Sequence, residues 1–392
     1  MKIPSAIRRN RFSLLLVYFF ISTSFITAQT YEQLLTEAQN NIQSKKYCEA
    51  QEKFDKALKT KEGEGENNPF VFYAAAASAG RCGNHNNAIS WLDQADKKGL
   101  VSKKEELSYI ESDSAFIKLH PLKEWNDIIT SMKLRISEKI AQENKLNKEW
   151  NISIKENALS IKNKRSLDPK SGFALYFTKV KDLEVPYMVY IPQKYDFKTP
   201  VSLIVYLHGG VVSTDKFNYD NYQIQQEPIF SIGEDLNAIV VYPFGKKDFG
   251  WVSQQEAFDN VLTIIDQVRS NFKIDKKNII LGGMSNGGTA AFYYASQKPN
   301  IFKGFYAISS NPNVLLDKIK FGNLSQGKEF ITLNAKDDSV YNFKDVESIY
   351  SKYKAGATDW KFRSVEDGDH GLIYNPEKGK DIFENIVKEL LQ

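Results

Sequence analysis

Five consecutive residues in the second half of the chain have the types and the spacing of a nucleophilic serine site. Gly283–Met284–Ser285–Asn286–Gly287 follows the apolar run Asn278–Leu281 and leads into a segment with helical spacing. A turn this tight between a strand and a helix accepts only small neighbours, and it lifts the serine hydroxyl above the sheet. The additional glycines Gly282 and Gly288 fit the same turn. We therefore predict that Ser285 is a nucleophile.

A serine hydroxyl becomes a good nucleophile only when a base removes its proton, so a histidine is required. The chain has 4 histidines, of which His85 and His120 belong to a helical first half and His208 ends a strand upstream of the serine. His370 lies in a loop after the last predicted strand, which suits the chain order serine, acid, histidine. We predict His370 as the base and His208 as a structural residue that holds its loop by a side-chain hydrogen bond.

The acid that orients the histidine should lie between these two residues, at the end of a strand. The run Phe330–Asn334 is such a strand, and Asp337 and Asp338 follow it closely. The spacing to Val340 matches a D-x-x-V turn and favours Asp337. Asp338 is the alternative.

Acyl transfer also needs backbone N–H groups aimed at the oxygen that becomes negative. Asn286, directly after the nucleophile, should supply one of them. The second should come from the loop His208–Gly209–Gly210–Val211, where two glycines let the backbone approach a substrate. We expect the amide of Gly210 or of Val211 to donate, and Gly210 is preferred.

Aromatic residues follow the strands on either side of this loop. Phe217 comes after the first, and Phe244 and Trp251 come after the next. Loops at the carboxyl ends of the strands of such sheets line ligand sites. These three side chains are therefore candidates for contact with substrate, although packing is their commoner role.

The elements around these residues alternate between strands and helices, which predicts a mostly parallel sheet covered by helices on both faces. The helical candidates are Glu256–Phe272, Gly287–Gln297, Asp345–Tyr353 and Lys378–Leu391. The predicted strands are Phe173–Lys179, Tyr187–Ile191, Ser202–Leu207, Ala238–Tyr242, Asn278–Gly282, Gly304–Ile308, Phe330–Leu333 and Trp360–Val365.

The stretch from about Val185 to Leu391, within a predicted catalytic domain of residues 171–392, resembles a serine esterase of the α/β-hydrolase superfamily. The resemblance is carried by Val185–Pro192, Val205–Gly210, Gly282–Gly288, the acid turn and the His370 loop. Its nearest groups are the polyhydroxybutyrate depolymerases and feruloyl esterases, together with the catalytic domains of prolyl oligopeptidases. It implies an α/β-hydrolase fold, hydrolysis of carboxylic esters through an acyl-enzyme, and no cofactor.

The resemblance leaves the substrate open. A small-molecule ester or an ester linked to a polysaccharide would suit the site, and a prolyl oligopeptidase type of peptidase is the nearest enzymatic alternative, because fold and triad do not choose between esters and peptides. A non-catalytic scaffold that binds through its N-terminal half is the alternative from another class.

Residues 30–150 show apolar residues at helical spacing and almost no strand signal. Small and aromatic positions around Ala50 and Ala88 make this half similar to tetratricopeptide repeats, whose concave surfaces often bind a protein partner. The resemblance brings together the two cysteines of the chain, Cys48 and Cys82, so we expect a disulfide, with two separate core thiols as the alternative, and no metal site. Residues 151–170 are polar and are expected to form a linker.

The first 28 residues have a basic start, an apolar run and small polar residues ending at Ala28, which is typical of a cleaved signal peptide. Export to the periplasm or the medium follows, with no membrane span after cleavage. The chain has 52 Lys and Arg against 48 Asp and Glu, and Lys2, Arg8, Arg9 and Arg11 fall in this segment. The remainder is balanced in charge, which argues against nucleic-acid binding through a broad basic face.

Overall fold

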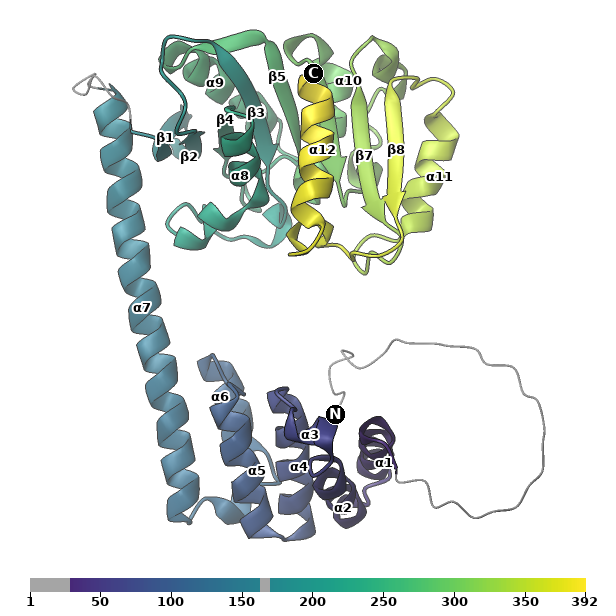
Figure 1. The fold of residues 1–392 in the computed structure, drawn as a ribbon. Coiled ribbons are helices and arrows are strands. Elements are labelled where there is room, and N and C mark those ends of the chain that lie inside the picture. The colour runs from purple at the N-terminus through teal and green to yellow at the C-terminus, as the bar shows by residue number, and fades with distance from the viewer. Residues whose placement is uncertain (1–28, 163–169) are drawn as a thin grey trace, which may run out of the picture. The chain divides into compact units, whose positions relative to one another are not determined.

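The computed structural model describes residues 29–162 and 170–392 (Figure 1). The predicted signal peptide, residues 1–28, lies outside the described residues. The chain divides into two compact units, a helical unit that ends at Ala141 and a sheet unit from Gln142 to Gln392. Within the described ranges, none of the helices has both the length and the apolar composition needed to cross a bilayer.

The helical unit is made of short antiparallel helix pairs. Helix α2 begins at Tyr47 and contains Ala50, and α5 begins at His85 and contains Ala88. Ala50 and Ala88 are fully buried, which lets neighbouring helices approach closely. The similarity to tetratricopeptide repeats itself stays a prediction. The helices of this unit are α1 (Tyr31–Gln43), α2 (Tyr47–Ala57), α3 (Lys61–Glu64), α4 (Pro69–Cys82), α5 (His85–Lys97), α6 (Lys104–Ser112), the 3₁₀ turn η1 (Ile117–Leu119) and the first part of α7 (Lys123–Lys162).

A disulfide joins Cys48 near the start of α2 to Cys82 at the end of α4. The two Cα atoms are 4.9 Å apart. The bond closes a loop across the first two helix pairs, so it restricts the unfolded chain of this unit.

The sheet unit contains one eight-stranded sheet with the order β1-β2-β4-β3-β5-β6-β7-β8. Strand β2 pairs antiparallel with β1 and β4, and the remaining pairs are parallel. Every predicted strand is present, and the predicted α/β-hydrolase fold is confirmed. The strands are β1 (Gly172–Val180), β2 (Leu183–Ile191), β3 (Val201–Leu207), β4 (Ile239–Pro243), β5 (Ile274–Met284), β6 (Gly304–Ile308), β7 (Phe330–Ala335) and β8 (Trp360–Val365).

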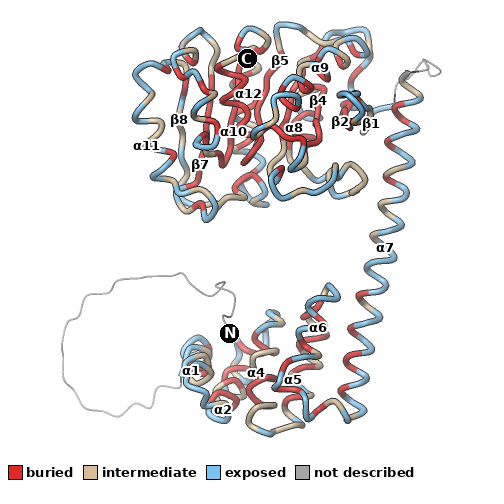
Figure 2. Tube along the Cα trace, turned by 180° about the vertical axis from the view of Figure 1, so that it is seen from behind, coloured by how far each residue is buried: buried red, intermediate tan, exposed pale blue. Residues whose placement is uncertain are grey.

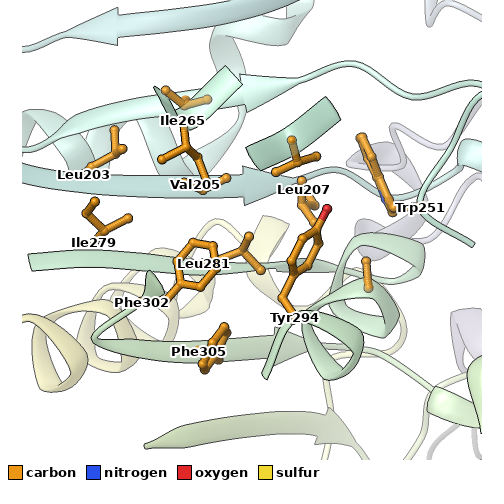
Figure 3. Packing of buried hydrophobic residues seen from close by; sticks show 14 of the residues in the cluster. Leu203, Val205, Leu207, Trp251, Ile265, Ile279, Leu281, Tyr294, Phe302 and Phe305 are labelled. Atoms are coloured by element: carbon orange, nitrogen blue, oxygen red, sulfur yellow. The ribbon is translucent and has the colours of Figure 1, made fainter. Parts of the chain in front are cut away.

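Alternation along β3 explains why helices cover both faces of the sheet. Leu203, Val205 and Leu207 enter one hydrophobic core (Figure 3), whereas Ile204 and Tyr206 enter the other. Successive side chains of a strand point to opposite faces, so a central strand with apolar residues throughout must be covered twice. Figure 2 shows the resulting concentration of buried residues in the strands and the helices that flank them.

Helices α9, α10 and α11 pack against the first core, and α8 and α12 pack against the second (Figure 1). Helix α8 is not among the helices predicted from the sequence. The helices are α8 (Pro228–Asp235), α9 (Gln255–Asn271), α10 (Asn286–Gln297), α11 (Phe343–Tyr353) and α12 (Gly379–Leu391), and the 3₁₀ turns are η2 (Val211–Ser213), η3 (Tyr222–Gln226), η4 (Pro299–Ile301), η5 (Pro312–Leu315), η6 (Phe321–Ser325) and η7 (Leu372–Tyr374).

Helix α7 corrects the expected linker at residues 151–170. The helix continues through Lys162, and Trp150, Ile154 and Ala158 are buried in the cores of the sheet unit. Residues four positions apart lie on one face of a helix, so these three form a narrow apolar stripe within an otherwise polar sequence. Residues 163–169 lie outside the described residues.

Candidate active site

Ser285 stands between the end of β5 and the first residue of α10, as the motif predicts. Its backbone has φ 54° and ψ −120°, a conformation that costs a residue with a side chain about 1–3 kcal/mol. The Ser285 amide donates to the carbonyl of Ile308 on neighbouring β6 at 2.9 Å. The sheet therefore holds the serine in a strained turn, which is the geometry of a nucleophile elbow.

The glycines around the serine are required by close backbone contacts. A Cβ atom on Gly283 would lie 2.1 Å from the carbonyl oxygen of Leu207, and one on Gly287 would lie 1.7 Å from the same atom. A Cβ on Gly288 would lie 2.7 Å from the Cβ of Ser310. No side chain fits at these distances, so the elbow can form only with glycine at these positions.

His370 is paired with Asp338, and the preference for Asp337 as its partner is wrong. The imidazole Nδ1 lies 3.0 Å from Oδ2 and 3.2 Å from Oδ1 of Asp338. Asp337 turns away, and its Oδ1 accepts the backbone N–H of Asp369 at 2.9 Å.

The turn after β7 explains this choice. The amides of Val340 and Tyr341 both donate to Oδ1 of Asp338 at 2.8 Å, so the turn closes on the second aspartate and not on the first. The side chain of Asp338 is fully buried, and that of His370 is 20% exposed. A carboxylate can only accept a hydrogen bond, so Nδ1 of His370 carries the donated proton and Nε2 is left as an acceptor.

The loop after β3 lies directly against the serine. A methyl group on Gly209 would stand 2.9 Å from Cβ and 3.6 Å from Oγ of Ser285. Gly210 has φ 69°, and its carbonyl accepts from the hydroxyls of Ser213 and Thr214 at 3.0 and 2.8 Å. These two hydrogen bonds bend the chain into η2. The backbone of the predicted oxyanion loop therefore lies beside Ser285.

The first predicted donor, the amide of Asn286, is the first N–H of helix α10. The first amides of a helix have no partner within the helix, and they carry its positive end. The amide is therefore free of helical bonding at the position next to the serine.

His208 is structural, as predicted. Its Nδ1 donates to the carbonyl of Gly209 at 2.6 Å, and its Nε2 accepts the amide of Gly245 at 3.0 Å. Burial lowers the pKa of His208 to about 4. The neutral imidazole thus ties the loop after β3 to the loop after β4.

The aromatic candidates pack behind this loop. Trp251 is 1% exposed and stands edge-on to the His208 ring, and Phe244 is 3% exposed. Phe217 is partly buried against Phe249. The burial of Trp251 and Phe244 assigns them to support of the oxyanion loop and not to an open substrate surface.

Sequence reasoning missed Tyr341, which links the two halves of the site. The amide group of Asn286 donates to the Tyr341 hydroxyl at 3.4 Å, and the Tyr341 ring stands edge-on to His370 with centroids 5.2 Å apart. The residue after the nucleophile and the predicted base therefore contact the same side chain. The only available signal was its place three residues after Asp338.

The arrangement combines a strained serine, a histidine with a buried carboxylate partner, and backbone amides next to the serine. These are the components of acyl transfer by nucleophilic catalysis. Among the described residues, no group of His, Cys, Asp and Glu side chains is arranged to hold a metal ion.

Comparisons with known proteins agree with this chemistry. Residues 252–338, which contain Ser285 and Asp338, match the model of the prolyl oligopeptidase family. A segment of 179 residues is 29% identical to a bifunctional acetylxylan esterase/xylanase from Neocallimastix patriciarum. The match covers 42% of this chain and 23% of that protein, so the chain spans less than a quarter of its relative's length.

Solved structures of several hydrolases align with part of this chain. A fluorophosphonate-binding serine hydrolase from Staphylococcus aureus has a TM-score of 0.45 and 14% identity, over 57% of this chain and 99% of that one. An S-formylglutathione hydrolase from Agrobacterium tumefaciens has a TM-score of 0.45 and 16% identity, over 58% of this chain and 99% of that one. The family model and the curated relative both describe hydrolases, and each covers less than half of this chain.

Proposed function

We propose that this protein is an exported serine hydrolase that cleaves carboxylic esters through Ser285, His370 and Asp338. The observation that carries the proposal is the strained serine at the elbow together with the His370–Asp338 pair. The disulfide of the helical unit supports export, because disulfides persist in oxidising compartments.

The proposed reaction gives each of these groups one role. Oγ of Ser285 bonds to the ester carbonyl carbon while its proton passes to Nε2 of His370. The carbonyl oxygen becomes negative and accepts hydrogen bonds from the amides of Asn286 and Gly210. The carbon–oxygen bond to the alcohol then breaks, and the departing alcohol takes the proton from His370.

Water completes the cycle. His370 removes a proton from a water molecule, whose oxygen bonds to the acyl carbon. The bond to Oγ then breaks, the serine recovers its proton from His370, and the carboxylic acid leaves. Asp338 accepts the Nδ1 hydrogen bond throughout and stabilises the imidazolium that forms in each half of the cycle.

The substrate class is part of the proposal. The curated relative is named as an acetylxylan esterase, so an acetyl ester of a polysaccharide hydroxyl is the first substrate to test. The match to the prolyl oligopeptidase family favours peptide hydrolysis as a second candidate. Comparing the rates at which the protein hydrolyses an ester and an amide with the same acyl group distinguishes an esterase from a peptidase.

Fluorophosphonate labelling followed by intact mass tests the nucleophile without knowledge of the substrate. We expect labelling of the wild type and its loss in Ser285→Ala. Ser364→Ala, at an exposed position of β8, is the matched control and should label normally. Absence of labelling in folded wild-type protein would contradict the proposal.

A further inference from the structure

A cavity on the α8 and α12 side of the sheet unit is not used by the proposed reaction. Its volume is about 530 Å³, and three segments line it: η3 with the start of α8, the turn η7, and the start of α12. Its lining includes Gln223, Gln226, Glu227, Tyr374, Asn375 and Lys380. We call it the Glu227 pocket.

The Glu227 pocket shares a loop with the predicted base. Turn η7 begins one residue after Gly371, which directly follows His370. The amide of Tyr374 donates to the carbonyl of Gly371 at 2.8 Å. One wall of the pocket is therefore built on the same short loop as the histidine.

Glu227 is the fixed polar group of the pocket. Its Oε2 accepts the hydroxyl of Tyr374 at 2.8 Å, and its Oε1 accepts the hydroxyl of Tyr242 at 3.5 Å. A carboxylate offers about four lone-pair sites, so acceptor capacity is left after these two bonds. The tyrosines hold the carboxylate in place, and a ligand hydroxyl can donate to it.

A buried tyrosine lies beside Glu227. Tyr206 is 0% exposed, and burial raises its pKa most, with further increases from Tyr374 and Glu227 nearby. The Tyr206 hydroxyl lowers the pKa of both Glu227 and Tyr374. Tyr206 therefore belongs with Tyr374 and Tyr242 to the tyrosines that hold Glu227 in place.

The charges of the pocket argue against an ionic ligand. Nζ of Lys380 lies 2.6 Å from a carboxylate oxygen of Asp235, so its charge is already paired. Burial raises the pKa of Glu227, and the hydroxyls of Tyr374 and Tyr242 already bond to its two oxygens.

The other groups of the lining suit an uncharged ligand that is rich in hydroxyls. Gln223, Gln226 and Asn375 carry amides, which both donate and accept hydrogen bonds. The ring of Tyr374 is 48% exposed and offers an apolar face with a polar edge. A sugar ring presents hydroxyls on its edge and C–H groups on its faces, which fits both kinds of surface.

We propose that the Glu227 pocket binds a sugar ring, and that this ring belongs to the alcohol part of the ester substrate. The second clause rests on the proposed function, whereas sugar binding does not. The same chemistry would also bind a free oligosaccharide, so the experiment separates the two sources.

The first measurement is calorimetric titration of xylotetraose into the full chain carrying Ser285→Ala. We expect binding, and we expect Glu227→Gln or Tyr374→Ala in that background to weaken it about tenfold or more, since the first replaces one acceptor oxygen by an NH2 group that cannot accept and the second removes the ring that faces the sugar. Glu256→Gln changes an exposed carboxylate outside the pocket and is the matched control. Thermal unfolding of each variant checks that it is folded, and Tyr374→Phe, which keeps the ring, should retain more affinity than Tyr374→Ala.

The second measurement compares kcat/KM for an acetylated xylo-oligosaccharide with kcat/KM for p-nitrophenyl acetate. If the pocket holds the alcohol part, the ratio of the two falls in Glu227→Gln and in Tyr374→Ala and is kept in Glu256→Gln. An unchanged ratio with weakened xylotetraose binding assigns the pocket to free sugar and overturns the substrate clause.

Failure of the pocket and failure of the proposed function give different results. The proposal that the pocket binds a sugar is overturned if xylotetraose does not bind. It is also overturned if xylotetraose binds the folded pocket variants as tightly as it binds the parent, even where esters are hydrolysed. The protein could instead bind xylotetraose through Glu227 but neither label with fluorophosphonate nor hydrolyse esters. That result would support the sugar site and would overturn the proposal that the bound sugar is part of an ester substrate.

Discussion

The Nδ1 atom of His370 lies 3.0 Å from Oδ2 of Asp338, and the side chain of that aspartate is fully buried. The neighbouring Asp337 bonds instead to the backbone of the loop that carries the histidine. Two adjacent carboxylates thus contact one loop in different ways. Asp338 orients the imidazole, whereas Asp337 holds the backbone next to it.

Asp338→Asn should lower kcat/KM for a small ester by roughly 10³–10⁴-fold, the size of effect seen when the orienting acid of a catalytic triad becomes an amide. The amide can donate to Nδ1 and so favours the wrong tautomer. Steady-state hydrolysis of p-nitrophenyl acetate measures the loss.

Asp337→Asn is the matched control for this prediction, because its side chain still accepts the Asp369 amide through the carboxamide oxygen. It should reduce turnover far less than Asp338→Asn. Equal losses in the two variants, or a larger loss in Asp337→Asn, would contradict the pairing.

Gly287→Ala should disrupt the elbow. The added Cβ would lie 1.7 Å from the carbonyl oxygen of Leu207, and backbone atoms cannot move aside without displacing β3. Overpacking of a tight core costs about 1–3 kcal/mol or more, so we expect a lower unfolding temperature together with loss of fluorophosphonate labelling.

The control for this substitution is Gly356→Ala, where the nearest atom to the new Cβ is the Tyr353 carbonyl oxygen at 3.9 Å. This variant should unfold and label like the wild type. Normal labelling in Gly287→Ala would argue that the turn is not the strained elbow that Ser285 indicates.

Local patterns were sufficient to predict the sheet and the serine. The apolar run of β3 fills two cores, so it specifies a central strand, and the glycines beside Ser285 specify a turn that no other residue permits. The choice between Asp337 and Asp338 depended on which carboxylate the turn amides reach. Neighbouring residues of the same type carry no local signal for that difference.

Two other features depend on contacts between distant segments. The stripe Trp150, Ile154 and Ala158 repeats at helical spacing, but it has only three apolar residues among polar neighbours, which is too few to predict a buried helix face. The Glu227 pocket joins segments that are 147 positions apart at Tyr374 and leaves no periodic pattern in the sequence.

His208 should make the sheet unit less stable in weak acid. Its pKa falls from an ordinary value of 6.5 to about 4 because of burial. Between these two values the unfolded chain binds a proton that the folded chain does not, so the free energy of unfolding decreases as pH falls from about 6.5 to about 4, by about 3 kcal/mol in total.

His208→Gln removes this titration and keeps a hydrogen-bond acceptor for the Gly245 amide. Urea denaturation at several pH values across this window should give a shallower loss of stability in the variant than in the wild type. The same slope in both proteins would show that other groups cause the acid sensitivity.

Removal of the disulfide should affect the helical unit alone. Cys48 and Cys82 are 34 positions apart, and closing a loop of that length stabilises a fold by about 3–4 kcal/mol through the unfolded chain. Cys48→Ser with Cys82→Ser should therefore lower the unfolding temperature of the helical unit. Hydrolysis of p-nitrophenyl acetate is the control measurement, and a large loss of activity would contradict the separation of the two units.

The end of α7 sets where the helical unit can be removed. Trp150 donates from its indole nitrogen to the carbonyl of Tyr219 at 3.0 Å, and Asn147 accepts the amide of Tyr222 at 2.9 Å. Both contacts hold the segment that leads from the oxyanion loop to α8. A chain that starts at Gln142 keeps them, whereas one that starts at Ile152 loses them.

We therefore expect the chain from Gln142 to fold and to label with fluorophosphonate, and the chain from Ile152 to be less stable by about 3–5 kcal/mol, as for the loss of a buried tryptophan side chain. Trp150→Ala in the full chain is the matched variant and should reproduce most of that loss, because it removes the same packing while α7 stays in place. Urea denaturation of the three proteins, followed through the sheet unit, measures the difference. If the chain from Ile152 were as stable as the chain from Gln142, the end of α7 would be dispensable, and the boundary of the sheet unit would lie beyond Trp150.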